Sequence, residues 1–347
     1  MKKKLSIKTI AQELNISITT VSFILNGKAK EMRISDQLIQ KVNDFMKEKN
    51  YHPNQFAQSL RTGKTKMIAL FVEDIADSFF ASVARLIEES AYQKGYKIIY
   101  CSTEDNLEKT RELIQLFKSR NVDGYIITPP KGIEKELKQL LQEELPFVLF
   151  DRYFPKINAD YVIIDNFEGT QEAIKHFQDQ GFKNIAFVTL DSDQTQMNER
   201  LRGYQLAMRE HEMPEYILKI PFKQDLEKVR NQFKAFFSAQ QQIDAVLFAT
   251  NYLAIKGFET LRNLNIKIGE DVAVIAFDDH EFFKVFNPPI TAVAQPMKAL
   301  SDHLISILLK KLHDESEPEL QNQIILPTNL IIRESSLRKN LVADQKN

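Results

Sequence analysis

Near the start of the chain, apolar residues recur at helical spacing in three short stretches, and a serine precedes each stretch. The first stretch lies over 7–14, the second over 18–25, and the third follows residue 35. Ser6, Ser17 and Ser35 stand where a hydroxyl can accept a free backbone N–H at the start of a helix. The pattern predicts three capped helices in a compact unit of about fifty residues, which is just large enough to fold.

The second predicted helix, in the stretch ISITTVSFILNGKA, carries an aromatic residue on its polar side. Val21 and Ile24 form an inward face, whereas Phe23 lies with Thr20 and Asn26 on the other side. An apolar ring at such a position either packs within the three-helix unit or contacts a partner.

The segment YHPNQFAQSLRTGKTK follows this unit. Pro53 suits the first turn of a helix, and residues 54–60 can form two turns before Thr62 and Gly63 end them. A helix this short is marginal by itself, so we expect it to become ordered when a partner binds.

From Met67 onward, apolar β-rich runs alternate with amphipathic helical patterns. Strands are expected at 67–72, 97–101, 123–127, 146–150, 161–164, 184–188, 244–249 and 272–276. Helices are expected near 79–94, 107–119, 133–143, 167–180, 198–212, 224–238, 251–264 and 296–312. Strict alternation predicts an α/β fold with two doubly wound parallel sheets. Ligands of such folds bind at the carboxyl ends of the strands, here in a cleft between two lobes.

Charge is distributed unevenly along the chain. Residues 1–66 contain thirteen Lys and Arg against five Asp and Glu, a net charge of +8. Because the whole chain has a net charge of −1, the remainder carries −9. A basic head suggests a polyanionic partner such as nucleic acid, although a solvated Lys-rich segment would have the same charge.

Several kinds of chemistry have no support in the sequence. A single cysteine, Cys101, cannot form a disulfide framework or a Cys-rich zinc site. The chain has no GxGxxG or phosphate-loop motif, and its six histidines lack metal-ligand spacing. The acids in TLDSDQ and AFDDHE could form an acid/base pair or a metal site, but no matching nucleophile or third ligand accompanies them. We therefore expect no enzymatic activity, no cofactor and no bound metal.

The opening residues, MKKKLSIKTIAQEL, contain no apolar run long enough for a signal peptide or a membrane span. We expect a cytoplasmic protein without a membrane partner.

The stretch IKTIAQELNISITTVSFILNGK, followed by YHPNQFAQSLRTGKTKMIAL, resembles the lactose-repressor (LacI/GalR) family of bacterial transcription regulators. The match joins a helix-turn-helix, an N-x-x-A-x-x-L hinge and the start of a two-lobed body like that of periplasmic binding proteins. The stretches VLFDRYFP, NERLRGYQLAM, VAVIAFDDHEFF and LPTNLIIRESS extend the resemblance over essentially the whole chain.

The resemblance implies three parts of the chain. A helix-turn-helix DNA-binding domain is expected at 1–51, a hinge helix with its linker at 52–65, and an effector-binding and dimerisation domain at 66–347. Within the last part, the N-lobe is expected at about 66–161 and 292–325, and the C-lobe at about 162–291 and 326–340.

The resemblance also implies a homodimer that binds an approximately palindromic operator in double-stranded DNA, with a recognition helix in each major groove. By position, the DNA-facing residues of the head are Ser17, Ile18, Thr19, Thr20, Ser22, Phe23 and Asn26. Ser17 and Asn26 are expected to contact phosphates, while Ile18, Thr19 and Phe23 face base edges.

In the hinge, Asn54, Ala57 and Gln58 match positions that contact the minor groove and phosphates. Leu60 matches an apolar wedge that enters a central base step and kinks the duplex.

A small effector, a sugar or a related metabolite, is expected between the two lobes. The matching positions are Phe79, Phe80, Asp151, Arg200, Thr250 and Asp278. Aromatic faces can stack on sugar C–H groups, while carboxylates and an Arg can bond to hydroxyls. Each residue also has an ordinary structural alternative, which is core packing for the rings and helix capping for the acids.

Three features depart from the family pattern. Phe23 stands where Arg commonly follows TVS, so the bidentate contact to guanine is missing and a thymine methyl becomes the better partner. The loop GKAKEMR is longer than in the lactose repressor and adds Lys28, Lys30 and Arg33. Thr250 occupies a position where Asn is common.

Two alternatives to a DNA-binding regulator are a sugar-binding protein without DNA function and an enzyme on a similar two-lobed body. The basic head and the hinge motif argue against the first, and the missing catalytic set argues against the second. In the favoured mechanism, the effector closes the cleft, changes the separation of the two hinges in the dimer, and so raises or lowers DNA affinity.

Replacing the predicted wedge tests this interpretation of the hinge. Leu60→Ala should weaken binding to a specific operator far more than binding to random duplex, because the wedge acts only on the bent site. Gel-shift titrations measure both affinities, and DNA bending assays measure the kink. Operator bending that does not change in the variant would contradict the wedge.

Overall fold

The computed structural model describes residues 6–51, 63–313 and 322–338. Contacts divide the chain into two compact units, Met1–Thr65 and Lys66–Asn347, which we call the head and the body. Each unit is described by itself.

The head contains the three predicted helices, α1 (Ile7–Glu13), α2 (Ile18–Leu25) and α3 (Asp36–Glu48). The predicted serine caps are confirmed: Ser6, Ser17 and Ser35 accept hydrogen bonds from the backbone N–H groups of Thr9, Thr20 and Leu38. Each cap satisfies a donor that the first helical turn would otherwise leave free.

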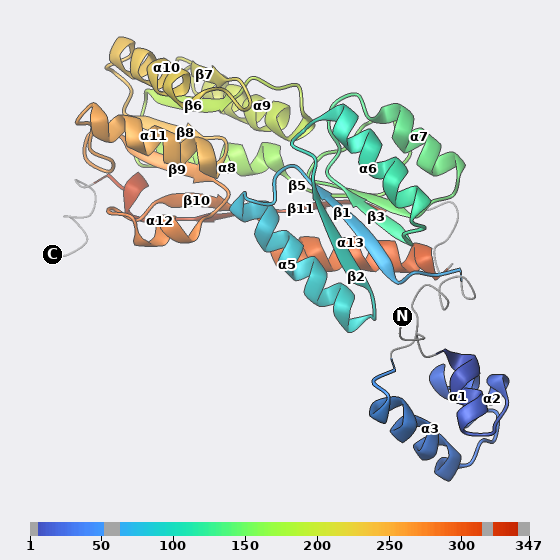
Figure 1. The fold of residues 1–347 in the computed structure, drawn as a ribbon. Coiled ribbons are helices and arrows are strands. Elements are labelled where there is room, and N and C mark those ends of the chain that lie inside the picture. Colours follow the sequence, from blue (N-terminus) through green and yellow to red (C-terminus); the bar gives the residue numbers. More distant parts are fainter. Residues whose placement is uncertain (1–5, 52–62, 314–321, 339–347) are drawn as a thin grey trace. The chain divides into compact units, whose positions relative to one another are not determined.

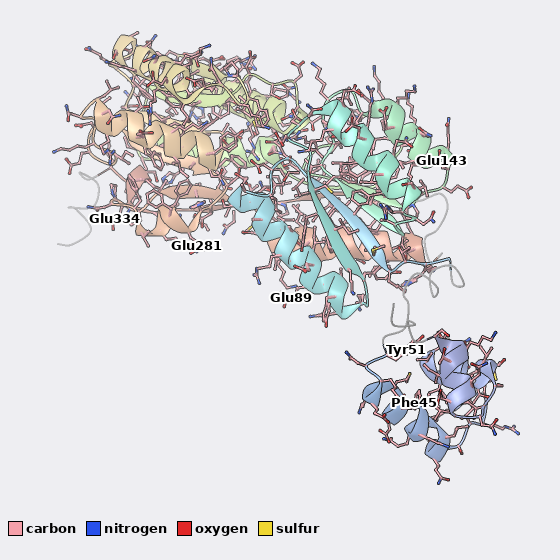
Figure 2. The ribbon with its side chains drawn as sticks, in the orientation of Figure 1. Phe45, Tyr51, Glu89, Glu143, Glu281 and Glu334 are labelled. Atoms are coloured by element: carbon pink, nitrogen blue, oxygen red, sulfur yellow. The ribbon has the colours of Figure 1, made fainter. Side chains whose placement is uncertain are left out.

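The core of the head is small. Ile10, Val21 and Val42 are fully buried, one from each helix. Phe45 and Tyr51 pack against the cluster that contains Ile10 and Val21, and Figure 2 shows both side chains within the head. Val42 belongs to a second cluster, and residues such as Met46 pack against both, so two adjoining apolar clusters hold the three helices together.

The body is built on two sheets, which in the described residues have six strands each (Figure 1). The N-lobe sheet has the order β11-β5-β4-β3-β1-β2 and is parallel throughout. Its strands are β1 (Met67–Val72), β2 (Lys97–Ser102), β3 (Gly124–Ile127), β4 (Phe147–Phe150), β5 (Tyr161–Ile164) and β11 (Gln323–Leu326).

The C-lobe sheet has the order β12-β10-β9-β8-β6-β7. Its strands are β6 (Ile185–Leu190), β7 (Tyr216–Ile220), β8 (Ala245–Phe248), β9 (Ala273–Phe277), β10 (Thr291–Ala294) and β12 (Asn329–Ile331). β12 runs antiparallel to β10, whereas the other pairs are parallel. The predicted α/β class with two doubly wound sheets is confirmed, with this one antiparallel edge as a difference.

Helices cover both faces of each sheet, as expected for parallel strands joined by crossovers. Those of the N-lobe are α5 (Ser78–Gln93), α6 (Leu107–Ser119), α7 (Glu134–Gln142) and α13 (Met297–Leu312). Those of the C-lobe are α8 (Asn166–Asp179), α9 (Thr195–Glu210), α10 (Leu226–Ala239), α11 (Asn251–Asn263), α12 (Glu281–Val285) and the 3-10 turn η1 (Glu334–Ser336). In Figure 1, α5 and α13 lie on one face of the N-lobe sheet, and α6 and α7 lie on the other.

In the described part of the chain, three connections join the lobes: Asp165 after β5, Gln295 and Pro296 after β10, and Pro327 and Thr328 after β11. β5 pairs within the N-lobe sheet and β10 within the C-lobe sheet, so each of these two connections leads from one sheet to a helix of the other lobe. The third connection packs closely against α8 at Gly169. A Cβ at this position would lie only 2.3 Å from Thr328 Oγ1, so a larger residue would clash.

Strands β7, β10, β11 and β12 are absent from the sequence-based prediction. They have three to five residues each, which is too short for a clear periodicity in the sequence.

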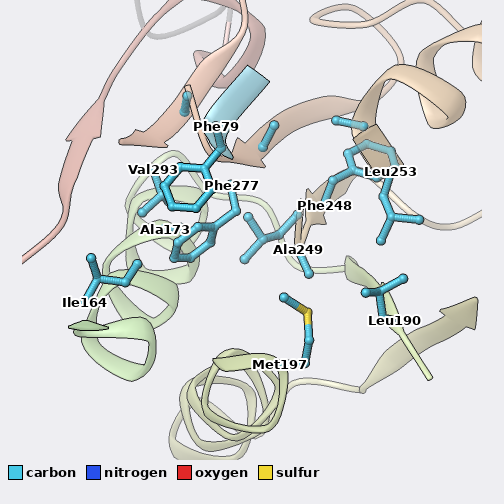
Figure 3. Packing of buried hydrophobic residues seen from close by; sticks show 14 of the residues in the cluster. Phe79, Ile164, Ala173, Leu190, Met197, Phe248, Ala249, Leu253, Phe277 and Val293 are labelled. Carbon is cyan, nitrogen blue, oxygen red and sulfur yellow. The ribbon is translucent and has the colours of Figure 1, made fainter. Parts of the chain in front are cut away.

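One buried apolar cluster extends through both lobes and includes Phe79 of α5, Ile164 of β5 and Phe277 of β9 (Figure 3). A second cluster lies between the N-lobe sheet and helices α6 and α7. None of the helices in the described part of the chain combines the length and apolar character needed to cross a bilayer.

Candidate functional site

The residues predicted to face DNA lie along α2 and its two ends. Ser17, Ile18 and Thr19 are exposed, and Ile18 keeps 50% of its surface accessible. An exposed Ile at the first turn of a helix has no part in the core, so it is available to a partner. The others, Thr20, Ser22, Phe23 and Asn26, are half-buried.

Phe23 does not belong to the interior of the head. Among the described residues, the two apolar clusters of the head include Val21 and Ile24 but not Phe23. The ring therefore stays at the surface, where the sequence pattern placed it.

Ser17 and Asn26, the two residues predicted to contact phosphates, form hydrogen bonds with neighbouring residues of the helix. Ser17 Oγ accepts the Thr20 N–H at 2.9 Å and lies 2.8 Å from Thr20 Oγ1. Asn26 Nδ2 donates to the Ser22 carbonyl oxygen at 2.5 Å. These bonds fix the two ends of α2, so both side chains are held in defined positions. The hinge residues Asn54, Ala57, Gln58 and Leu60 lie outside the described residues.

In the body, a cavity of about 350 Å³ lies between the two lobes. All six predicted effector residues line it: Phe79, Phe80, Asp151, Arg200, Thr250 and Asp278. The cavity lies at the carboxyl ends of β1, β4, β6, β8 and β9, which is where parallel sheets present side chains to ligands.

Asp151 and Asp278 occupy equivalent places in the two lobes. Asp151 directly follows β4 and Asp278 directly follows β9, and both have left-handed backbones, with φ of 67° and 68°. Aspartate tolerates this conformation better than most residues, but it still favours glycine. The strained turns aim one carboxylate from each lobe at the cavity.

Arg200 of α9 is held on all sides and is only 2% exposed. Its Nε donates to Asn166 Oδ1 at 2.7 Å, and its Nη1 donates to the Ala249 carbonyl oxygen at 2.5 Å. The guanidinium carbon lies 3.7 Å from the ring centroid of Phe277, and Nη1 lies 3.7 Å from Asp278 Oδ2. This arrangement pre-orients a planar cation beside an acid at the cavity wall.

Phe79, Phe80 and Thr250 line the cavity and also stabilise the surrounding structure. Phe79 and Phe80 contact each other with ring centroids 5.1 Å apart, and both contact Phe150 at 5.9 Å. Thr250 Oγ1 accepts the Leu253 N–H at 3.3 Å and so caps α11. The structural alternatives considered for these residues thus apply alongside their position at the cavity.

A buried arginine that the sequence analysis missed organises the N-lobe side of the cavity. Arg152 contacts Glu73 through Nη2, Asp105 through Nη1 at 2.7 Å, and Asp151 through Nε at 3.2 Å. These acids follow β1, β2 and β4, so one guanidinium joins three strand ends. The signal was available, because Arg152 is the residue after Asp151 in VLFDRYFP.

Hydrogen bonds and ion pairs join the two lobes. Among them are Lys131 with Asp193, Glu104 with Lys223 at 2.6 Å, Asp105 with Gln194 at 2.9 Å, and Ser78 with Asn251 at 3.1 Å. All of these contacts depend on the separation of the lobes.

The acids around the cavity have altered pKa values. Burial raises the pKa of Asp151 to about 7, and the charges of Asp278 and Asp77 add to this effect while Arg200 opposes it. Burial also raises the pKa of Asp77 to about 6 and that of Asp278 in the same direction. Clusters of perturbed acids in a cleft are typical of functional sites.

Within the residues that the structure describes, no group of three or more His, Cys, Asp or Glu side chains could hold a metal ion. The cavity therefore offers hydrogen-bonding and aromatic surfaces rather than a metal-ligand set.

Comparison with known proteins agrees with this architecture. Residues 6–54 match the family described as bacterial regulatory proteins, lacI family, and residues 174–336 match the periplasmic binding protein-like domain. The HTH-type transcriptional regulator DegA of Bacillus subtilis (strain 168) is 31% identical over 340 residues, which cover 96% of this chain and 98% of DegA. The chain belongs to the LacI family.

This LacI-family protein is thus a transcriptional regulator with a helix-turn-helix DNA-binding domain and a ligand-binding domain. Its fold is similar to that of the lac repressor dimer bound to operator and an anti-inducer, with a TM-score of 0.85 at 19% identity over 96% of this chain and 100% of that one. A LacI-type regulator from Alkaliphilus metalliredigens QYMF, complexed with D-xylulofuranose, has a TM-score of 0.68 at 23% identity over 78% of this chain and 98% of that one.

The raised pKa of Asp151 predicts a pH-dependent stability difference. The folded carboxyl keeps its proton to a higher pH than in the unfolded chain, where Asp titrates near 4, so folding loses stability as pH rises from about 4 through 7. Asp151→Asn cannot ionise and should gain at least about 1 kcal/mol relative to wild type between pH 5 and pH 8. Urea unfolding at both pH values measures this change.

Asp302→Asn provides the matched control, because Asp302 is exposed on α13 and paired with Lys298. Its stability difference from wild type should stay constant between the two pH values. A constant difference in Asp151→Asn as well would show that the Asp151 carboxyl keeps an ordinary pKa in the folded protein.

Proposed function

We propose that this LacI-family regulator binds a specific operator in double-stranded DNA as a homodimer, and that a sugar or sugar derivative in the body cavity controls its operator affinity. Because the target is chromosomal DNA, the protein acts in the cytoplasm. It has a regulatory rather than an enzymatic role.

The observation that carries the proposal is that both lobes contribute side chains to the cavity. Asp151 and Phe79 come from the N-lobe, whereas Arg200 and Asp278 come from the C-lobe. A ligand that bonds to both sets gains most of its binding free energy when the lobes are close together. Ligand binding therefore shifts the lobes toward one arrangement, which is the requirement for an allosteric effector.

The composition of the cavity supports a polyhydroxylated ligand. Phe79 and Phe80 offer aromatic faces, Asp151 and Asp278 offer acceptors, and Arg200 offers a fixed charged plane. These groups suit C–H stacking and charge-assisted bonds to hydroxyls. A volume of about 350 Å³ also falls within the range of small-molecule sites. The D-xylulofuranose complex of the Alkaliphilus regulator is consistent with such a ligand.

The exposed side of α2 supports DNA recognition by the head. Ile18 and Phe23 lie outside the apolar clusters of the head. We propose that both face base edges, together with Thr19. Ser17 and Asn26 position the helix on phosphates, and Thr20 and Ser22 also face the DNA. Asn54, Ala57, Gln58 and Leu60 act in the minor groove, where the hinge helices of two subunits meet.

Apolar side chains on the C-lobe surface support the homodimer. Ile255 of α11 and Phe282 of α12 expose 41% and 43% of their surfaces and border a wide groove, and Val285 of α12 exposes 79%. Exposed apolar groups gathered in one area are typical of subunit interfaces. A second copy covers them in the proposal, in keeping with the dimeric lac repressor of the same fold.

Titration of labelled DNA with the full-length protein tests the operator proposal. Two chains per operator, a steep fall in affinity with salt and a preference of at least about 1000-fold over random duplex are expected. Candidate sugars should then change that affinity at fixed salt. Binding without preference over random duplex would contradict a sequence-specific regulator.

Phe23→Arg tests which base the recognition helix reads. The wild-type ring should favour the C5-methyl of thymine, whereas Arg should favour guanine through bidentate hydrogen bonds. Selection of binding sites from random DNA, carried out with both proteins, should therefore give consensus half-sites that differ at one position. Identical half-sites would mean that Phe23 only packs against the head.

A further inference from the structure

The hydrogen-bond donors in the cavity wall are largely engaged by the protein itself. Three glutamine side-chain amides point their NH2 groups at carboxylates, which accept hydrogen bonds when ionised. The pairs are Gln194 with Asp105, Gln196 with Asp151 and Gln295 with Asp278, with N···O distances of 2.9, 3.3 and 2.6 Å. Asn251 likewise donates to Ser78 at 3.1 Å.

Three of the four cations that line the cavity are also engaged. Arg152 is surrounded by Glu73, Asp105 and Asp151, and Lys223 pairs with Glu104. Two donors of Arg200 are used by Asn166 and by the backbone of Ala249, as described above. The fourth cation, Lys256, lies over the Tyr252 ring, and burial lowers the pKa of its ammonium group. A negatively charged ligand must therefore displace protein partners or rely on this one lysine.

The acceptors, in contrast, are in surplus. Gln196 is only 3% exposed, and its Oε1 is buried without a hydrogen-bond partner among the described residues. This orientation of the amide is dictated by its Nε2, which faces Asp151 Oδ2 and Gln194 Oε1. A buried carbonyl oxygen of this kind costs free energy until a donor reaches it.

Three carboxylates add to this surplus. Asp77, Asp151 and Asp278 line the same cavity from the two lobes, and their mutual repulsion contributes to the raised pKa of Asp77 and of Asp151. The positive charge of Arg200 favours the ionised forms of Asp151 and Asp278, and Arg152 Nε lies 3.2 Å from Asp151. Acids still outnumber cations in the cavity wall, which contains Glu73, Asp74, Asp77, Asp151 and Asp278 against Arg152, Arg200, Lys223 and Lys256.

We infer that the cavity selects an amine-bearing polyol, such as an amino sugar, whose ammonium group is attracted by the charges of Asp77, Asp151 and Asp278 and whose hydroxyl groups donate to acceptors such as Gln196 Oε1. A hydroxyl in place of the ammonium binds more weakly, and a carboxylate or phosphate binds more weakly still. This inference rests on the proposed effector role of the cavity and specifies the ligand class.

Matched sugar sets test the ranking. For the gluco and galacto series, the amino sugar, the parent sugar and the uronic acid differ mainly in the charge of one substituent. Isothermal titration of the full-length protein at pH 7 should give affinities in the order amine, hydroxyl, acid, with the amine at least tenfold tighter than the acid. An acid that binds as tightly as the amine, or no binding by any member of either series, would overturn the inference.

Asp77→Asn tests the charge directly. Asp77 Oδ1 caps α5 by accepting the N–H groups of Phe79 and Phe80, and Asn keeps such an acceptor, so the helix start is preserved. The preference for the amine over the parent sugar should fall about tenfold in this variant and stay unchanged in Asp302→Asn. An undiminished preference in Asp77→Asn would overturn the assignment of the ammonium to this group.

The failure of this inference can be told apart from a failure of the proposed function. Operator affinity without sugar is measured on the same preparation and does not depend on the ligand ranking. Loss of specific DNA binding would contradict the regulator proposal, whereas an acid-preferring cavity with intact operator control would contradict only the ligand class.

Discussion

The buried contact of Arg152 with three acids is the constraint on which the N-lobe side of the cavity depends. Burying an arginine with its acidic partners is costly and is tolerated only when charges and hydrogen bonds compensate one another closely. Here the compensation also ties together the ends of β1, β2 and β4. As a result, Asp151 and Asp105 are fixed where the C-lobe residues Gln196 and Gln194 can reach them. An ion cluster within one lobe thereby determines how that lobe meets the other.

Much of the fold could be predicted because local signals agree with it. Ser6, Ser17 and Ser35 mark helix starts, and long apolar runs mark strands that are buried on both faces. The short strands β10 and β12 could not be found in this way, because their positions arise from pairing with segments distant in sequence.

Some residues of the candidate site could likewise be predicted from the sequence, whereas others could not. Asp151 and Asp278 could be identified because each directly follows an apolar run, and parallel strands present such residues at one edge. Gln196 carries no comparable signal: its importance comes from a buried oxygen, which is a property of the packed structure. Arg152 stood beside a predicted residue, but only the distances to Glu73 and Asp105 reveal that it is an internal counter-ion.

The second connection between the lobes, Gln295 and Pro296, is bonded directly to the cavity wall. Gln295 is part of that connection, and its amide bonds to Asp278 Oδ1 at 2.6 Å. Any rotation of the lobes must alter backbone torsions in this segment, because the three connections are the pivots of the body. A ligand that competes for Asp278 thus acts on a pivot as well as on the two surfaces that close over it. In the proposed mechanism, one hydrogen bond therefore links the acid that contacts the ligand to a segment that must bend.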